Sequence, residues 1–259
     1  MLETITQVRA ACDAAQDQEA KAKSLRIVMV RHGESAGNTL GSYFATPEEK
    51  GILKKLWPNE YDFPLTSVGV EQAKGLVTTL APIFAASGGY IPDSVAVYSS
   101  NMVRANQTMM LACRGWAEAC IKHDDNIASL IREKYSGPAI FMPREELHKM
   151  YPNREAEWVK NPYTFEGLGE SIQSCESRVL STMDALLKKY AHEFSLVNTV
   201  VLFTHGGYMM AAECVTTDMT VEEAKHLRAP HNCGVYEFEV SSSEFRLINK
   251  LQTTKYVVK

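Results

Sequence analysis

The sequence predicts an α/β fold, a three-layer α/β/α sandwich built on a mostly parallel central sheet. Residues 25–30 and 199–204 are short apolar runs rich in β-branched side chains, which is typical of strands buried on both faces of a sheet. Each run stops at a histidine that is followed by glycine. Histidine is costly to bury without partners, so we expect both to lie at the carboxyl edge of the sheet, where α/β proteins bind ligands.

The first of these two strands organises the chain. It leads directly into Arg31-His32-Gly33, and the second strand leads into His205-Gly206-Gly207. Of the seven histidines in the chain, only His32 and His205 follow a buried strand and precede a glycine. Glycine permits a turn or a close approach of the backbone to a ligand. Two imidazoles at one sheet edge, one of them preceded by an arginine, predict a single anion-binding site.

Several elements are predicted before the second strand. Residues 2–23 have apolar side chains at helical spacing, which predicts an amphipathic N-terminal helix over residues 1–24. Residues 39–64 contain several prolines and glycines, and an irregular connection of this length is usually functional or disordered. Within it, we expect Lys50, Lys54 and Lys55 to form a solvated basic face.

Two further helices and a strand are predicted in the first half of the chain. Thr66 is a suitable N-cap for a long helix that runs to about Ala86, and Pro82 should kink or end that helix. Residues 94–100 are a third strand candidate. A helix is expected to follow, with Arg104 in its first turn, and to run to about Ile121.

The second half of the chain begins with a long irregular stretch. Residues 138–170 mix prolines, aromatic side chains and basic side chains, which indicates an excursion over the carboxyl edge of the sheet, where a lid would lie. We expect a helix to about Phe194 after it and another over residues 208–217. Gly206 and Gly207 would leave the first amides of the latter helix free to cradle an anion. Residues 235–240 and 245–251 alternate as two strands joined by serines, which predicts a terminal hairpin.

Composition limits the class of protein. At 259 residues we expect one domain over residues 1–259. The net charge of −4 argues against nonspecific nucleic-acid binding, and no apolar run approaches the ~18 residues that span a membrane. The N-terminus has no hydrophobic signal core. The six cysteines are scattered, so we expect reduced thiols and a cytoplasmic protein.

The polar motifs together resemble one family. Arg31 to Asn38, which reads Arg-His-Gly-Glu-Ser-Ala-Gly-Asn, resembles the opening motif of the histidine phosphatase superfamily, branch 1, which includes the phosphoglycerate mutases. The spacing Ser-x-x-x-Arg-Ala-x-Gln-Thr around Arg104 resembles the second arginine motif of that family. Glu133, four residues before Gly137, matches the segment that supplies the general acid. The motifs occur in the family's order, from about residue 26 to residue 240, and they imply a phosphoglycerate mutase-like fold.

The resemblance also implies a role for each site residue. His32 would attack phosphorus and become a phosphohistidine, and Arg31 and Arg104 would hold the phosphoryl oxygens. Glu133 would protonate the leaving oxygen and later activate water, while a charged His205 would stabilise the transferred group. Substrate-binding residues would be Ser35, Asn38 and Gly206. No spacing typical of a metal site is present, so we expect neither a metal nor another cofactor.

The sequence departs from the mutases at several positions. Residues 138–170 lack the adjacent arginine pair of the mutases, Ser136 stands where they carry a tyrosine, and Gly207 stands where they carry an asparagine. These departures favour a metal-independent phosphomonoester hydrolase, with a phosphorylated small molecule as the expected substrate. A cofactor-dependent phosphoglycerate mutase and a noncatalytic adaptor that recognises phosphate remain as alternatives. The sequence names neither the substrate nor the oligomeric state.

Overall fold

The structure is a computed structural model that describes residues 24–42, 44–85, 94–116, 118–153, 169–191, 195–217, 219–224 and 226–251. The amphipathic helix predicted for residues 2–23 lies outside these residues, as does the middle of the predicted 138–170 excursion. None of the described helices is long and apolar enough to cross a membrane. Five of the cysteines are described, and all five are buried and free.

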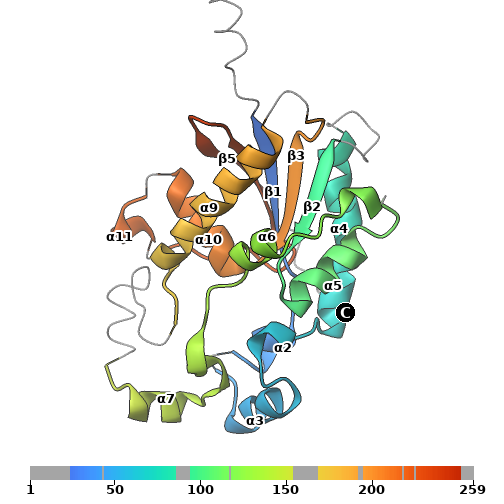
Figure 1. Ribbon diagram of the computed structural model, residues 1–259. Helices are drawn as coiled ribbons and strands as arrows, with labels where there is room; N and C mark the ends of the chain where they lie inside the picture. The colour runs from blue at the N-terminus through green and yellow to red at the C-terminus, as the bar shows by residue number, and fades with distance from the viewer. Residues whose placement is uncertain are drawn as a thin grey trace, which may run out of the picture.

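A five-stranded sheet with the order β2-β3-β1-β4-β5 forms the centre of the fold (Figure 1). β3 pairs in parallel with both β1 and β2, while β4 runs antiparallel to β1 and β5, so the mostly parallel sheet and its terminal hairpin are confirmed. The strands are β1 (Leu25–Arg31), β2 (Val95–Ser99), β3 (Thr199–Thr204), β4 (Val235–Val240) and β5 (Phe245–Leu251).

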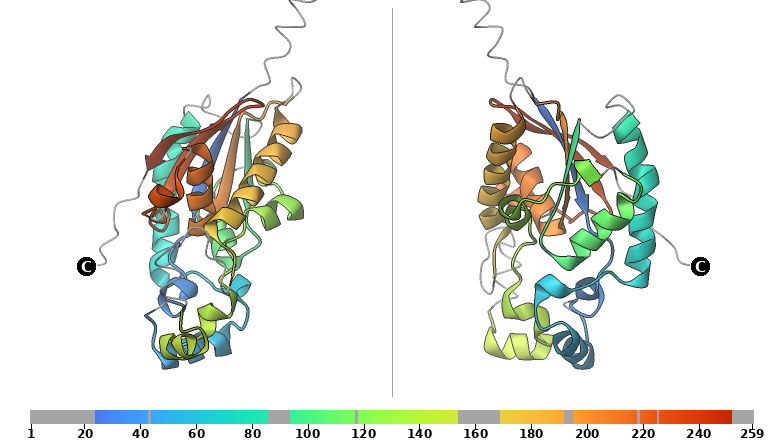
Figure 2. Two further views of the ribbon diagram at one scale, coloured as in Figure 1. Left: turned by 90° about the vertical axis from the view of Figure 1, so that its left-hand side faces the viewer. Right: turned by 45° about the vertical axis from the view of Figure 1, so that its right-hand side comes forward.

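Helices cover both faces of this sheet, which confirms the three-layer sandwich (Figure 2). Because side chains alternate along a strand, Ile27 and Met29 of β1 face one core cluster while Val28 and Val30 face the other. α4 (Ser67–Ala85) and α5 (Val103–Ala112) lie on the Val28 side. On the Ile27 side lie α6 (Asp125–Leu130), α9 (Ile172–Tyr190), α10 (Gly206–Thr216) and the short α11 (Val221–Ala224).

The two segments that the sequence indicated as excursions come together beyond the carboxyl ends of the strands, and we call this region the cap (Figure 1). Phe63 of the first segment meets Phe141 of the second edge to face, with ring centroids 5.9 Å apart. The described parts of these segments contain more regular structure than predicted. The cap elements are α2 (Ala36–Thr39), α3 (Pro47–Leu56), η1 (Glu60–Asp62), η3 (Gly137–Phe141) and α7 (Arg144–Met150).

The prediction that Lys50 lies on a solvated basic face is wrong. Lys54 and Lys55 of α3 are exposed, as expected of a solvated face, but Lys50 is buried. Its ammonium donates to the carbonyls of Gly41 and Ile140, each at 2.8 Å. Buried carbonyls need partners, so one lysine satisfies a group in each half of the cap and joins the two halves.

Most predicted helices are present, but some of them end earlier than the sequence predicted. The Thr66 hydroxyl caps α4 by accepting from the Gly69 amide at 3.1 Å, and Pro82 lies in the last turn of that helix. α5 ends at Ala112 instead of Ile121, because Gly115 turns the chain with a φ of 93° before the 3-10 turn η2 (Glu118–Cys120). α9 ends at Tyr190, short of the predicted Phe194.

Candidate active site

The two strand-terminal histidines meet, as the sequence predicted. β1 and β3 are neighbours in register, with Arg31 opposite Thr204, so the residues that follow the two strands emerge side by side. The rings of His32 and His205 lie with centroids 5.1 Å apart, and both side chains are buried. Parallel pairing therefore brings together two imidazoles that are far apart in the chain.

The ring of His32 is held in one orientation and one tautomer. Its Nδ1 lies 2.6 Å from the carbonyl oxygen of Gly33, which can only accept, so Nδ1 carries the proton. Nε2 then has the lone pair, and it accepts from Arg104 Nε at 3.3 Å. The nitrogen that faces Arg104 is therefore the unprotonated one, which is the form that a nucleophile requires.

Two guanidinium groups act on this ring, Arg104 by direct contact and Arg31 through its charge. Arg104 lies in the first turn of α5, as predicted, and its Nη1 donates to the carbonyl of Glu60 at 2.8 Å. Arg31 Nη1 donates to the carbonyl of Pro230, while its buried Nε has no hydrogen-bond partner among the described residues. Unpaired buried donors are costly, so an anion placed between the two arginines would satisfy a group that the protein leaves unpaired.

This environment keeps both imidazoles neutral. Burial lowers the pKa of His32 well below its usual 6.5, and the charges of Arg104 and Arg31 lower it further. Burial likewise lowers the pKa of His205, with further lowering from Arg104, His32, Arg31 and Arg178. Burial and the neighbouring cations therefore work against the charge expected on His205, so that charge would need an anion beside the ring.

Several residues outside the predicted set hold these rings and loops. Ser100, which follows β2, lies with its hydroxyl 2.9 Å from Nε2 of His205. Thr108 of α5 accepts from the Gly33 amide at 3.1 Å and donates to the carbonyl of Arg104 at 2.7 Å. Both residues belong to the arginine motif that the sequence showed, so their position in that motif was the available signal.

Glu133 reaches the same place from the segment that follows α6. Its Oε1 accepts from the amides of Lys134 at 2.8 Å and Gly207 at 3.0 Å, so one of the α10 amides expected to cradle an anion is already used. Candidate ligand atoms of Glu133, His32 and His205 lie within 4.8 Å of one another, close enough in geometry to hold a metal ion. The two adjacent guanidiniums oppose a cation there and favour an anion.

Glu60 is a further carboxylate that the sequence reasoning missed. It lies in η1 of the cap and is 7% exposed, and one of its carboxylate oxygens, Oε1, is buried without a partner among the described residues. Burial raises its pKa, the charge of Arg104 opposes this rise, and the charge of Glu133 adds to it. No sequence motif marks this residue, because only the fold of the cap brings it to Arg104.

The predicted substrate-binding residues lie around the same loop. Ser35 is buried, and its hydroxyl donates to Asn38 Oδ1 at 3.1 Å. Asn38 is exposed, and its Oδ1 also accepts from the Ser35 amide at 3.1 Å and from Asn232 Nδ2 at 3.2 Å. Gly206 is buried at the start of α10, where a Cβ would lie 3.3 Å from Nε of Arg31.

Comparison with known proteins identifies the family. The family model described as histidine phosphatase superfamily (branch 1) matches residues 27–251. The chain is 24% identical over 199 residues to a metal-independent phosphoserine phosphatase of Arabidopsis thaliana, which covers 76% of this chain and 71% of that protein.

Solved structures share the fold. The structure of a mycobacterial glucosyl-3-phosphoglycerate phosphatase complexed with VO3 matches with a TM-score of 0.60 and 18% identity, covering 88% of this chain and 100% of that one. A phosphoserine phosphatase mutant from Entamoeba histolytica matches with a TM-score of 0.61 and 19% identity, covering 90% and 100%. At these identities the likeness concerns the fold alone.

Proposed function

The chain belongs to the histidine phosphatase superfamily, branch 1, and on that premise we propose that it is a metal-independent phosphomonoester hydrolase acting through a phosphohistidine at His32. One observation carries the proposal. The Gly33 carbonyl holds the proton on Nδ1 of His32, so Nε2 keeps its lone pair beside Arg104, and the charge of Arg31 acts on the same ring.

The first step transfers the phosphoryl group. Nε2 of His32 attacks phosphorus, the bond from phosphorus to the ester oxygen breaks, and the arginines stabilise the equatorial oxygens. Glu133 donates a proton to the leaving oxygen. Its Oε1 already accepts two backbone amides, so Oε2 is the oxygen that carries this proton.

The second step regenerates the enzyme. Water attacks phosphorus, Glu133 accepts a proton from that water, and the bond from phosphorus to nitrogen breaks with its electron pair returning to Nε2. An anionic phosphoryl group beside His205 would raise the pKa of that ring, so His205 becomes a donor to the phosphate once the substrate is bound. Three further residues would complete the phosphate site. They are Asn38, through its side-chain amide, together with Ser35 and Gly206.

The activity is tested by measuring phosphate release from a panel of phosphomonoesters. The panel includes phosphoserine, because two similar proteins are named for it. A mutase would need a bisphosphorylated primer and would isomerise its substrate, whereas a hydrolase releases phosphate without either. An adaptor would bind phosphate and release none.

The phosphoenzyme is tested separately. A turnover reaction quenched into base and mapped by mass spectrometry should carry phosphate on His32. His32→Ala should lose nearly all turnover and still bind inorganic phosphate within about a few-fold, because the arginines remain. Labelling of His205 with none on His32 would overturn the assignment.

A further inference from the structure

Glu133 is placed by a segment that has no regular structure. Residues 131–136 lie in neither a helix nor a strand, so no helical or sheet hydrogen bonds define their path. Turnover by a general acid is sensitive to position, and a shift of ~1 Å can cost about 10²-fold. Something other than secondary structure must therefore hold this segment.

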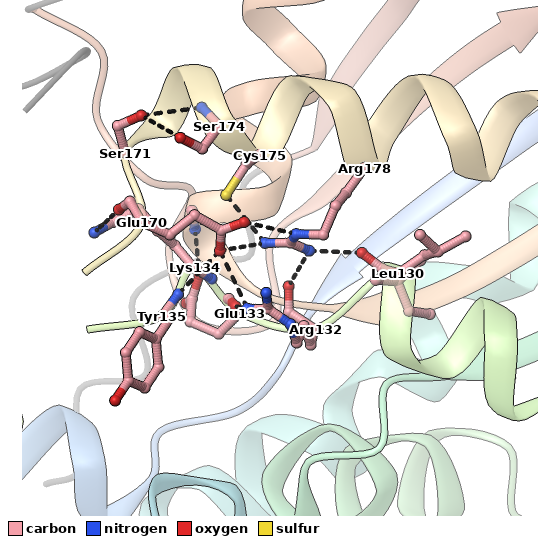
Figure 3. A network of polar contacts seen from close by, with 12 residues as sticks. Leu130, Arg132, Glu133, Lys134, Tyr135, Glu170, Ser171, Ser174, Cys175 and Arg178 are labelled. Carbon is pink, nitrogen blue, oxygen red and sulfur yellow. Dashed lines mark hydrogen bonds and ion pairs between the residues drawn. The ribbon is translucent and has the colours of Figure 1, made fainter. Parts of the chain in front are cut away.

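Figure 3 shows what holds it. Arg178 of α9 forms a bidentate pair with Glu170, with Nε to Oε1 and Nη2 to Oε2 both at 2.8 Å. The same guanidinium donates through Nη1 to the carbonyls of Leu130 at 2.6 Å and Arg132 at 3.0 Å. Arg178 therefore brackets the chain immediately before Glu133.

Glu170 holds the chain on the other side of Glu133. Its Oε2 accepts from the Tyr135 amide at 3.1 Å and from Arg132 Nη1 at 3.1 Å. Arg132 Nη1 also donates to the carbonyl of Glu133 itself at 2.9 Å. The Glu170 amide donates to the carbonyl of Tyr135 at 2.8 Å.

The segment that begins at Gly169 and the segment of residues 131–136 approach closely, and this approach depends on the glycine. A Cβ on Gly169 would lie 2.1 Å from the Tyr135 carbonyl oxygen, so only glycine lets the chain pass there. Both Glu170 and Arg178 are largely buried, with 14% and 13% of their side chains exposed. Burial alone would raise the pKa of Glu170, but the hydrogen bond and charge of Arg178 outweigh it and lower that pKa to about 2. Glu170 is thus a fixed anion and not a second proton donor.

We propose that Glu170 and Arg178 are positioning residues that hold Glu133 against the leaving oxygen. This inference rests on the proposed role of Glu133 as the general acid. The pair acts through the backbone on both sides of Glu133, and none of its described hydrogen bonds goes to His32, Arg31 or Arg104. It should therefore affect protonation of the leaving group without weakening phosphate binding.

The test compares single-turnover phosphoryl transfer from an alkyl phosphate and from nitrophenyl phosphate. An alkoxide needs a proton to leave, whereas a nitrophenolate hardly needs one. Arg178→Lys keeps the charge but loses the fork geometry, and Glu170→Gln provides a second variant if the first does not fold. In each variant the single-turnover rate should fall at least about 10-fold on the alkyl ester and about two-fold or less on the aryl ester. The affinity for inorganic phosphate should not change.

Glu237→Gln is the matched control, because it breaks a comparable ion pair with Arg26 that lies on the sheet. This variant should lose stability without changing the ratio of the two rates. Arg178→Lys combined with Glu133→Gln should be no slower than Glu133→Gln alone, since the two residues act through one group.

Two negative results are distinguishable. In the first, Arg178→Lys and Glu170→Gln slow phosphoryl transfer equally on both esters, while Glu133→Gln slows it mainly on the alkyl ester. This result would refute the positioning role but leave Glu133 as the general acid. Equal losses in Glu133→Gln itself would remove the general acid and, with it, the basis of the inference.

Discussion

Gly207 allows the sharpest test of how tightly Glu133 must be placed. The Gly207 amide donates to Glu133 Oε1 at 3.0 Å, and a Cβ at this position would lie 2.6 Å from that oxygen and 2.9 Å from the Cβ of Lys134. Ordinary van der Waals contact begins at 3.4 Å, so in Gly207→Ala the carboxylate must move by about 0.8 Å.

A displacement of this size predicts a loss of about 10- to 100-fold in turnover of an alkyl phosphate. The carboxylate is the end of a flexible side chain and can yield, but the Cβ of Lys134 is fixed to its backbone, so the segment at Lys134 must also shift and some stability should be lost. Rates on alkyl and nitrophenyl phosphates, together with thermal melting, measure both effects. Gly51→Ala is the control, because nothing lies within 4 Å of a Cβ there and its activity should not change. Unaltered turnover of the alkyl ester by Gly207→Ala would refute the claimed tight placement.

Three other predictions concern the site and the cap. The pKa values of His32 and His205 lie well below 6.5, so below about pH 6.5 the unfolded chain binds more protons than the native protein does. The free energy of unfolding should therefore fall as the pH drops below about 6.5. Melting curves between pH 7 and 5 should show this decline, and it should be smaller in His32→Asn. Activity should survive exhaustive chelation; loss in chelator with recovery on adding a divalent ion would contradict metal independence. Lys50→Met should cost about 1–3 kcal/mol in urea unfolding, because it leaves the carbonyls of Gly41 and Ile140 unpaired, whereas exposed Lys54→Met should be neutral.

The elements that carry the site could be predicted because their signals are local. An apolar run of strand length that leads into a histidine followed by glycine identifies β1 and β3, and parallel pairing then requires His32 and His205 to share one edge. The motif around Arg104 placed that residue in the first turn of α5 for the same reason. The motif spacing also singled out Glu133, although nothing in its sequence neighbours distinguished it from an exposed ion-pair residue.

The sequence by itself therefore determined the strands, most of the helices and the identity of the predicted site residues, since periodicity and motif spacing are properties of neighbours in the chain. Only the tertiary structure decided the protonation of His32, through the Gly33 carbonyl and the burial that keeps both imidazoles neutral. It also decided the burial of Lys50 and Glu60 in the cap and the clamp that Glu170 and Arg178 form around Glu133. The physical reason is that desolvation and hydrogen-bond partners depend on which distant segments pack together, and no local pattern in the sequence records that packing.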